Sequence, residues 1–221
     1  MASEHGGAVL FDVDGTLLDT NYLHVAAWWE AFRERGHEAS CADIHRALGM
    51  GSADLIRQVL GEADDSVSAA HSRRFAPYLG QLRPLRGARE LLEATAKLGL
   101  SVLLATSAKD DEVDLMLAAL DAESSITAVV SSGDVERAKP DPAIVEAALT
   151  RSGTRPERAV MVGDTVYDVM AAARADVCCI GLLSGGISEA ELRDAGAAEV
   201  YAGPADLLGR LPGSAIGRLG T

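Results

Sequence analysis

The stretch AVLFDVDGTLLDT, residues Ala8–Thr20, places two carboxylates directly behind an apolar run. The apolar run, Ala8–Phe11, has the composition of a short strand that is buried on both faces. Asp12 and Asp14 follow it, and because residues two apart in an extended segment point the same way, they are expected to converge on one point. A buried carboxylate is costly unless it is paired or bound to a metal, so we expect a positive group there.

Two interpretations of this stretch are open. Gly15 allows the chain to turn sharply after the strand, and Thr16 is expected to hydrogen-bond to nearby backbone as the loop opens. An ordinary acidic turn, with one Asp capping a helix and the other in solvent, uses the same residue types. The rest of the chain has to decide between a turn and a site.

A second pair of acids lies far downstream, in AVMVGDTVYDVMAAARA. The run Ala159–Val162 predicts another buried strand, which is followed by Gly163 and Asp164. If a helix begins near Thr165, Asp168 faces back toward Asp164, because four residues make about one helical turn. The two acids then form a cluster of the kind that holds a metal ion.

A hydroxyl group and a cation follow other predicted strands. Thr106 and Ser107 end the apolar run GLSVLLA, and Lys139 stands before a Pro-rich helix start in ERAKPDPAIVEAAL. Loops at the carboxyl ends of strands build the site of an open parallel α/β sheet. Carboxylate ligands favour Mg²⁺, lysine and hydroxyl groups bind phosphate, and a carboxylate beside Mg²⁺ can act as a nucleophile.

These motifs resemble those of the haloacid dehalogenase superfamily, specifically its phosphatase and phosphomutase branch. The family's motif DxDGT matches Asp12–Thr16, and its second motif, a strand ending in Thr or Ser, matches Leu103–Thr106. The third motif is Lys139, and the fourth, GDxxxD, matches Gly163–Asp168. All four occur in the family's order, over residues 8–168.

The resemblance implies a role for each matching residue. Asp12 is the expected nucleophile and Mg²⁺ ligand, and Asp14 the general acid and base, with its backbone carbonyl on the metal. The metal is expected to bind Asp164 as well, with Asp168 as an alternate or more distant ligand. The remaining expected contacts with phosphate or substrate come from Thr106, Lys139, Ser107, His24 and the loop residues Val13 and Gly15.

Asp14 separates phosphoryl transfer from dehalogenation. The dehalogenase branch lacks an acid here, because a halide leaves without protonation, so Asp14 indicates an oxygen leaving group. Lys139 and Mg²⁺ are expected to keep Asp12 ionised, while Asp14 can be protonated to donate to the leaving oxygen.

Helix and strand signals divide the chain into two predicted parts. Residues 19–84 show helix signals only, with Ser40 and Ser52 where helices begin, and the resemblance implies a four-helix cap domain. Residues 1–18 and 85–221 are predicted to form an α/β core with a doubly wound parallel sheet. Its helices are expected at 88–98, 110–120, 141–151, 166–174, 188–194 and 204–211, and its later strands at 100–105, 126–131, 158–162, 177–182 and 198–201. The Gly-rich end, 212–221, is predicted to fray.

Composition is that of a soluble enzyme. The 221 residues suffice for one α/β domain with an insertion, and the net charge of −13 disfavours nucleic acid and anionic membranes as partners. Cys41, Cys178 and Cys179 are odd in number, so no disulfide framework is expected, and the adjacent pair is predicted to pack in the core. Without a signal segment or a run of the roughly 18 apolar residues that a membrane span needs, we expect a cytoplasmic monomer or dimer.

The resemblance thus predicts a Mg²⁺-dependent phosphatase that hydrolyses a small-molecule phosphate monoester through an aspartyl-phosphate. A β-phosphoglucomutase-like phosphomutase is the first alternative. That branch carries an arginine after its cap turn, whereas here Ser52 follows Gly49–Gly51, with Arg46 and Arg57 as substitutes. A non-catalytic protein that binds a phosphorylated metabolite is the second alternative. The spacing of motifs does not identify the substrate.

Overall fold

The structure is a computed structural model that describes residues 6–220, apart from the side chains of residues 110 and 111. Its six strands are β1 (Ala8–Phe11), β2 (Ser101–Ala105), β3 (Ala128–Val130), β4 (Ala159–Gly163), β5 (Cys178–Leu182) and β6 (Glu199–Tyr201). Its α-helices are α1 (Asn21–Glu34), α2 (Cys41–Ala47), α3 (Ser52–Leu60), α4 (Asp65–Leu79), α5 (Ala88–Lys97), α6 (Asp110–Leu120), α7 (Ala143–Ser152), α8 (Val166–Arg174), α9 (Glu189–Asp194), α10 (Pro204–Gly209) and α11 (Ala215–Leu219).

The six strands form one parallel sheet in the order β3-β2-β1-β4-β5-β6. The chain runs from β1 outward through β2 and β3, and then returns to β4, β5 and β6 on the other side. Ala8 aligns with both Ser101 and Ala159, so the three central strands lie in register. The carboxyl ends of β1 and β4 therefore meet where the strand order reverses, which is where open α/β sheets bind ligands. The predicted doubly wound sheet is confirmed.

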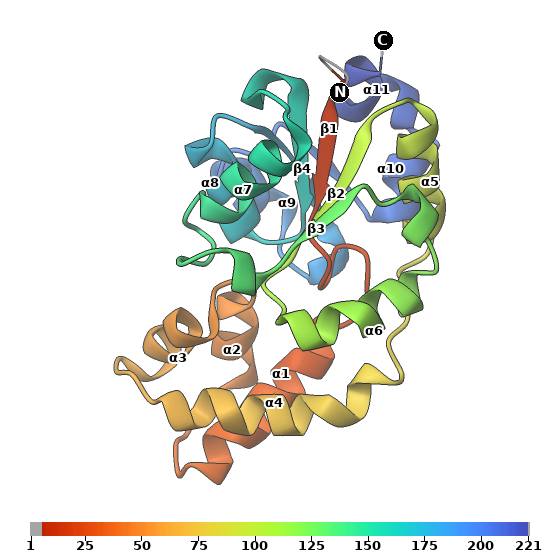
Figure 1. The fold of residues 1–221 in the computed structure, drawn as a ribbon. Helices are drawn as coiled ribbons and strands as arrows, with labels where there is room; N and C mark the ends of the chain where they lie inside the picture. The colour runs from red at the N-terminus through yellow and green to blue at the C-terminus, as the bar shows by residue number, and fades with distance from the viewer. Residues whose placement is uncertain (1–5, 221) are drawn as a thin grey trace.

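Helices cover both faces of the sheet, because alternate strand residues point to opposite sides (Figure 1). Val9 and Phe11 belong to a core that includes residues of α5, α6, α10 and α11. Ala8 and Leu10 belong to the opposite core, which includes residues of α7, α8 and α9. The strand β1 is thus fully buried, as its unbroken apolar run predicts.

Helices α1–α4, here called the helical group, lie beyond the carboxyl ends of the strands (Figure 1). They have a hydrophobic core of their own, built around Trp28, Phe32, Ile44 and Leu55. Ser40 caps α2, because its Oγ accepts a hydrogen bond of 3.0 Å from the N–H of Asp43. Ser52 is the first residue of α3, as predicted, and Gly51 precedes it without a side-chain cap.

The expectation that residues 212–221 fray is wrong as far as residue 220; residue 221 lies outside the described part. A 3-10 turn at Leu211–Gly213 leads into α11, whose N-terminus is capped by the Ser214 hydroxyl. Ile216 is fully buried in the core shared with α5 and α10. The prediction for the cysteine pair is half right, because Cys179 is buried while Cys178 is exposed.

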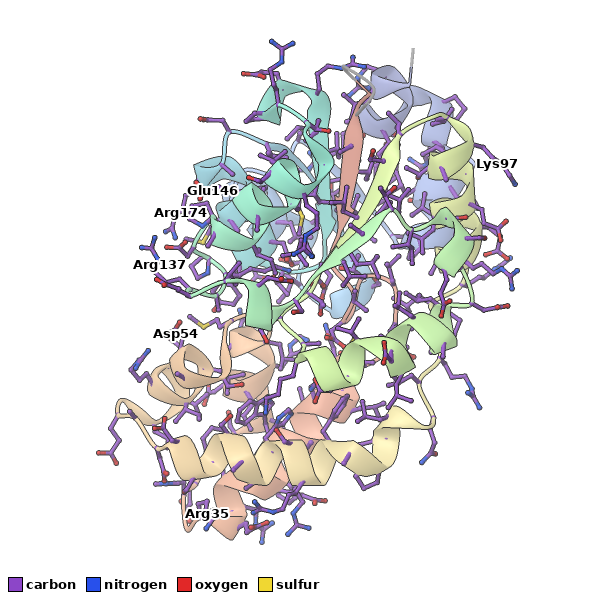
Figure 2. All side chains as sticks on the ribbon, in the orientation of Figure 1. Arg35, Asp54, Lys97, Arg137, Glu146 and Arg174 are labelled. Atoms are coloured by element: carbon purple, nitrogen blue, oxygen red, sulfur yellow. The ribbon has the colours of Figure 1, made fainter. Side chains whose placement is uncertain are left out.

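The outer surface carries most of the charge. Figure 2 labels six charged side chains on the outside of the two parts, all of them exposed or half-exposed: Arg35, Asp54, Lys97, Arg137, Glu146 and Arg174. Within residues 6–220, none of the helices combines the length and the apolar character needed to cross a membrane.

Candidate active site

The loop after β1 is shaped by one carbonyl and one glycine. The carbonyl of Val13 accepts hydrogen bonds from the N–H groups of Leu17 and Leu18 at 2.8 and 2.9 Å, which folds the loop back on itself. Gly15 has φ of 75°, a conformation that favours glycine, and a Cβ there would collide with Asn21 and with Asp164. Glycine is therefore required where the first motif approaches the fourth.

Lys139 joins two of the predicted site acids. Its Nζ donates to Asp12 Oδ1 at 2.6 Å and to the carbonyl of Ala105 at 2.9 Å. It also lies 2.7 Å from Asp168 Oδ1, as an ion pair outside hydrogen-bonding geometry. Burial by itself lowers the pKa of Lys139, but the carboxylates of Asp12 and Asp168 outweigh it and raise the pKa. Lys139 is the positive group expected opposite Asp12.

Asp164 is held by side chains from the first motif and from the helical group. Its Oδ1 accepts a hydrogen bond of 2.9 Å from Thr16 Oγ1, and its Oδ2 accepts one of 2.8 Å from Asn21 Nδ2. The Thr16 hydroxyl therefore bonds to a distant carboxylate, and not to local backbone as predicted. Burial, followed by the charges of Asp12 and Asp168, raises the pKa of Asp164 well above its ordinary value.

The three buried acids fit a divalent cation. One carboxylate oxygen from each of Asp12, Asp164 and Asp168 lies within 4.8 Å of the others. Among the described residues, Lys139 is the cation that pairs with Asp12 and Asp168, and burial raises the pKa of Asp12 to about 7 despite this lysine. Oxygen ligands with surplus negative charge are what Mg²⁺ requires, so the residues present suit that ion.

Asp14 occupies a different environment from Asp12. Its Oδ1 accepts a hydrogen bond of 2.6 Å from Thr20 Oγ1 and lies 3.3 Å from His24 Nε2. Burial would raise the pKa of Asp14, but the charge of His24 and the hydrogen bonds from His24 and Thr20 lower it. The protein groups alone thus bias Asp14 toward the ionised form and Asp12 toward the protonated form, the reverse of the expected order.

A stack of aromatic rings stands behind His24. His24 stacks on Phe75 with ring centroids 3.8 Å apart, and His71 stacks on Trp28 at 3.9 Å. His24 Nδ1 lies 3.2 Å from His71 Nε2. His24 therefore contacts Asp14 with one ring nitrogen and His71 with the other. Burial lowers the pKa of His71 to about 2. His71 is therefore a neutral partner of His24 at ordinary pH.

A cavity of about 100 Å³ opens between the helical group and the ends of the strands. Of the predicted residues, Asp12, Asp14, His24 and Ser107 line it. Thr106 is buried and does not line the cavity; its Oγ1 accepts a 3.1 Å hydrogen bond from the N–H of Ala108.

Other predicted residues are engaged elsewhere. The N–H of Gly15 donates to the Leu18 carbonyl at 2.8 Å, which counts against Gly15 as a phosphate donor. Arg46 pairs with Glu191 at 2.6 Å and Arg57 with Asp54 at 2.5 Å, both at exposed positions. The phosphate contacts predicted for Val13 and Thr106 stay predictions.

Several residues at the site carry no signal in the sequence. Asn21 and Thr20 look like ordinary helix-start residues, and His71 stands in a polar helical run. Ser184 and Gly185 follow β5, where Ser184 Oγ donates to the Gly15 carbonyl at 2.7 Å. Of these, Asn21 could have been suspected, because it directly follows the stretch Ala8–Thr20 that carries the first motif.

Comparisons with known proteins agree with the motifs. The profile of the haloacid dehalogenase-like hydrolases matches residues 9–182. Validoxylamine A 7′-phosphate phosphatase of Streptomyces hygroscopicus subsp. limoneus is 28% identical over 178 residues, covering 78% of this chain and 84% of that protein. Phosphoglycolate phosphatase of Rhodospirillum rubrum is 30% identical over 212 residues, covering 88% and 86%.

A solved structure agrees as well. A hydrolase from Pseudomonas syringae has a TM-score of 0.88 and 35% identity, covering 94% of this chain and 98% of that one. The profile match spans all four motifs. The chain therefore belongs to the haloacid dehalogenase-like hydrolase family, in the branch that includes phosphatases.

Proposed function

We propose that this protein is a Mg²⁺-dependent phosphatase that hydrolyses a small-molecule phosphate monoester through an aspartyl-phosphate on Asp12. One observation carries the proposal: the Asp12 carboxylate belongs to a buried acidic cluster and also lines the same cavity as Asp14. The arrangement supplies a nucleophile and an acid to one small volume.

The first half-reaction uses Asp12 and Asp14. A carboxylate oxygen of Asp12 attacks phosphorus, a new P–O bond forms to Asp12, and the ester P–O bond breaks. Asp14 gives its proton to the leaving oxygen. Lys139 holds Asp12 in place through its 2.6 Å contact and favours the ionised nucleophile. A Mg²⁺ bound by Asp12, Asp164, Asp168 and the backbone carbonyl of Asp14 would neutralise charge on the phosphoryl oxygens.

The second half-reaction returns the enzyme to its starting state. A water molecule attacks phosphorus, Asp14 accepts the proton of that water, and the bond to Asp12 breaks to release phosphate. His24 and Thr20 hold the Asp14 side chain by contacts of 3.3 and 2.6 Å. Their bias toward the ionised Asp14 suits the base of this step. The proton that Asp14 takes from the water leaves it protonated for the first half-reaction of the next turnover.

The helical group is proposed to act as a cap, residues 19–84, over a core of residues 1–18 and 85–221. The hydrophobic cluster within α1–α4 supports this division, and Ala27 and Phe75 join the helical group to the core that covers one face of the sheet. Contacts across the boundary include Lys109 Nζ to Ser72 Oγ at 2.8 Å and His45 Nε2 to the Gly185 carbonyl at 2.7 Å. A cap in this position would exclude water and contact the leaving group.

The cavity favours a substrate with one phosphate group. A phosphomutase has to hold an intermediate with two phosphate groups, so we favour a phosphatase. Arg46 and Arg57, the substitutes for the missing cap arginine, pair with acids outside the cavity. Phosphorus NMR with a hexose 1-phosphate distinguishes the two: release of phosphate supports the phosphatase, and faster isomerisation contradicts it. The cytoplasm is the proposed compartment, because the three cysteines are unpaired.

Hydrolysis of an aryl phosphate with and without Mg²⁺ tests the proposal. We expect activity that disappears with a chelator and in Asp12→Asn. A panel of sugar, nucleotide and organic-acid phosphates then identifies the substrate class. If no member of the panel is hydrolysed by the folded protein, the non-catalytic binding protein is the better account.

A further inference from the structure

We infer that two residues of the helical group position the acid Asp164, Asn21 by a direct hydrogen bond and His45 through the backbone of Gly185, so that metal binding and docking of the helical group stabilise each other. This inference rests on the proposed metal site. It assigns a function to three residues that the proposed chemistry does not use directly.

Asn21 is the first residue of α1, and it is 6% exposed. Its Nδ2 donates to Asp164 Oδ2 at 2.8 Å and contacts the Gly185 carbonyl at 3.3 Å. An amide nitrogen carries two hydrogens, so both bonds can form at the same time. The first residue of the helical group thus holds a carboxylate of the acidic cluster directly.

Gly185 brings a second helix to the same point. Its carbonyl also lies 2.7 Å from His45 Nε2 in α2, and the ring of His45 stacks on Tyr22 of α1 at 5.5 Å. A Cβ on Gly185 would overlap the carboxylate of Asp164, so the backbone of this residue lies directly against the acid. A movement of α2 would therefore be transmitted to Asp164 through the backbone of Gly185 alone.

The other acid of the fourth motif is contacted in a similar way. A Cβ on Gly49, in the turn between α2 and α3, would lie 2.7 Å from Thr165 Oγ1. That hydroxyl donates to Asp168 Oδ2 at 2.6 Å. The helical group thus touches the residues that hold both Asp164 and Asp168, from two different segments.

These contacts link metal binding at the acidic cluster to docking of the helical group. The donor of Asn21 stabilises the ionised, metal-binding form of Asp164, and it is in place only while the helical group is docked. A docked helical group therefore raises metal affinity, and by reciprocity a bound metal strengthens docking. Residues behind metal ligands commonly change metal affinity by roughly 10–100-fold when they are replaced.

Titration of the metal-free protein with Mg²⁺ in a calorimeter, without substrate, tests the inference. We expect Asn21→Ala to weaken binding by roughly 10-fold or more and His45→Ala by several-fold. His45→Gln, which keeps an N–H donor, should restore most of the affinity. Arg46→Ala is the matched control, because it removes a contact of 2.6 Å with Glu191 across the same boundary but away from Gly185.

Limited proteolysis of residues 80–84 supplies a readout of docking. Mg²⁺ should slow cleavage in the wild type and in Arg46→Ala, and much less in His45→Ala. If His45→Ala binds Mg²⁺ as tightly as Arg46→Ala and is protected equally, the inference is wrong while the proposed function stands. If the wild type does not bind Mg²⁺, both fail. If Asn21→Ala does not fold, the comparison of His45→Ala with Arg46→Ala still tests the inference.

Discussion

The amino group of Lys139 lies 2.6 Å from the Oδ1 of Asp12, although 127 positions separate the two residues in the chain. The same amino group contacts Asp168 at 2.7 Å and the carbonyl of Ala105 at 2.9 Å. One lysine thus connects the loop after β1, the last residue of β2 and the first turn of α8. The position of the proposed nucleophile depends on it.

Replacing Lys139 should destabilise the protein as well as inactivate it. Lys139→Met leaves the buried carboxylates of Asp12 and Asp168 without their cation, which typically costs about 3–5 kcal/mol of unfolding free energy. Urea unfolding in a chelator measures the loss, and added Mg²⁺ should recover part of it. The exposed Lys97 is the control, since Lys97→Met should change stability by less than about 0.5 kcal/mol. Equal effects for the two variants would contradict the assigned role of Lys139.

Replacing Asp14 should separate binding from turnover. Asp14→Asn keeps the shape of the cavity but can neither donate nor accept the proton, so kcat should fall by about 10²–10⁴-fold. The loss should be greater for alkyl phosphates than for aryl phosphates, because the poorer leaving group needs protonation more. Vanadate should still bind. A variant that turns over alkyl phosphates at nearly the normal rate would exclude Asp14 as the acid.

The buried His71 predicts a loss of stability in mild acid. Its pKa is about 2 in the folded protein against 6.5 ordinarily, so below about pH 6.5 only the unfolded chain takes up a proton there. The contribution is complete above pH 6.5 and declines as the pH falls. His71→Phe keeps a ring against Trp28 but cannot take up a proton. Between pH 6.5 and about pH 5, its free energy of unfolding should therefore fall by about 2 kcal/mol less than that of the wild type. Parallel unfolding profiles for the two proteins would refute this.

The C-terminal segment should contribute to stability. Ile216 is fully buried, so Ile216→Ala should cost roughly 2–5 kcal/mol, measured by thermal or urea unfolding. Ala202→Gly is the control, because it also shortens a side chain in the C-terminal part of the chain, but at an exposed position. A variant with wild-type stability would mean that α11 does not pack as described.

The sequence predicts the elements with strong periodicity well. The apolar run of β1, the strand before Asp164 and the return of Asp168 toward it are all present, because buried strands and helix starts leave local patterns. The prediction for residues 212–220 is wrong, since the glycines there suggest fraying while Ile216 is buried in a core formed with distant residues. Local composition does not report such tertiary contacts.

The same limit applies to the site. Lys139 can be recognised because it belongs to a family motif, but its contact with Asp168 cannot be read from spacing. Asn21 and Gly185 are brought to Asp164 only by the fold, across 143 positions in the case of Asn21. The pKa bias between Asp12 and Asp14 also depends on burial and on His24, neither of which a motif specifies.

Detection of a phosphoryl group on Asp12 tests the central claim most directly. The protein is mixed with Mg²⁺ and a hydrolysed phosphate ester, quenched in acid during turnover, digested and analysed by mass spectrometry. We predict one phosphoryl group on the peptide that contains Asp12, labile to hydroxylamine and absent from Asp12→Asn. Sustained turnover with an unmodified Asp12, or with the phosphoryl group on another residue, would contradict the account.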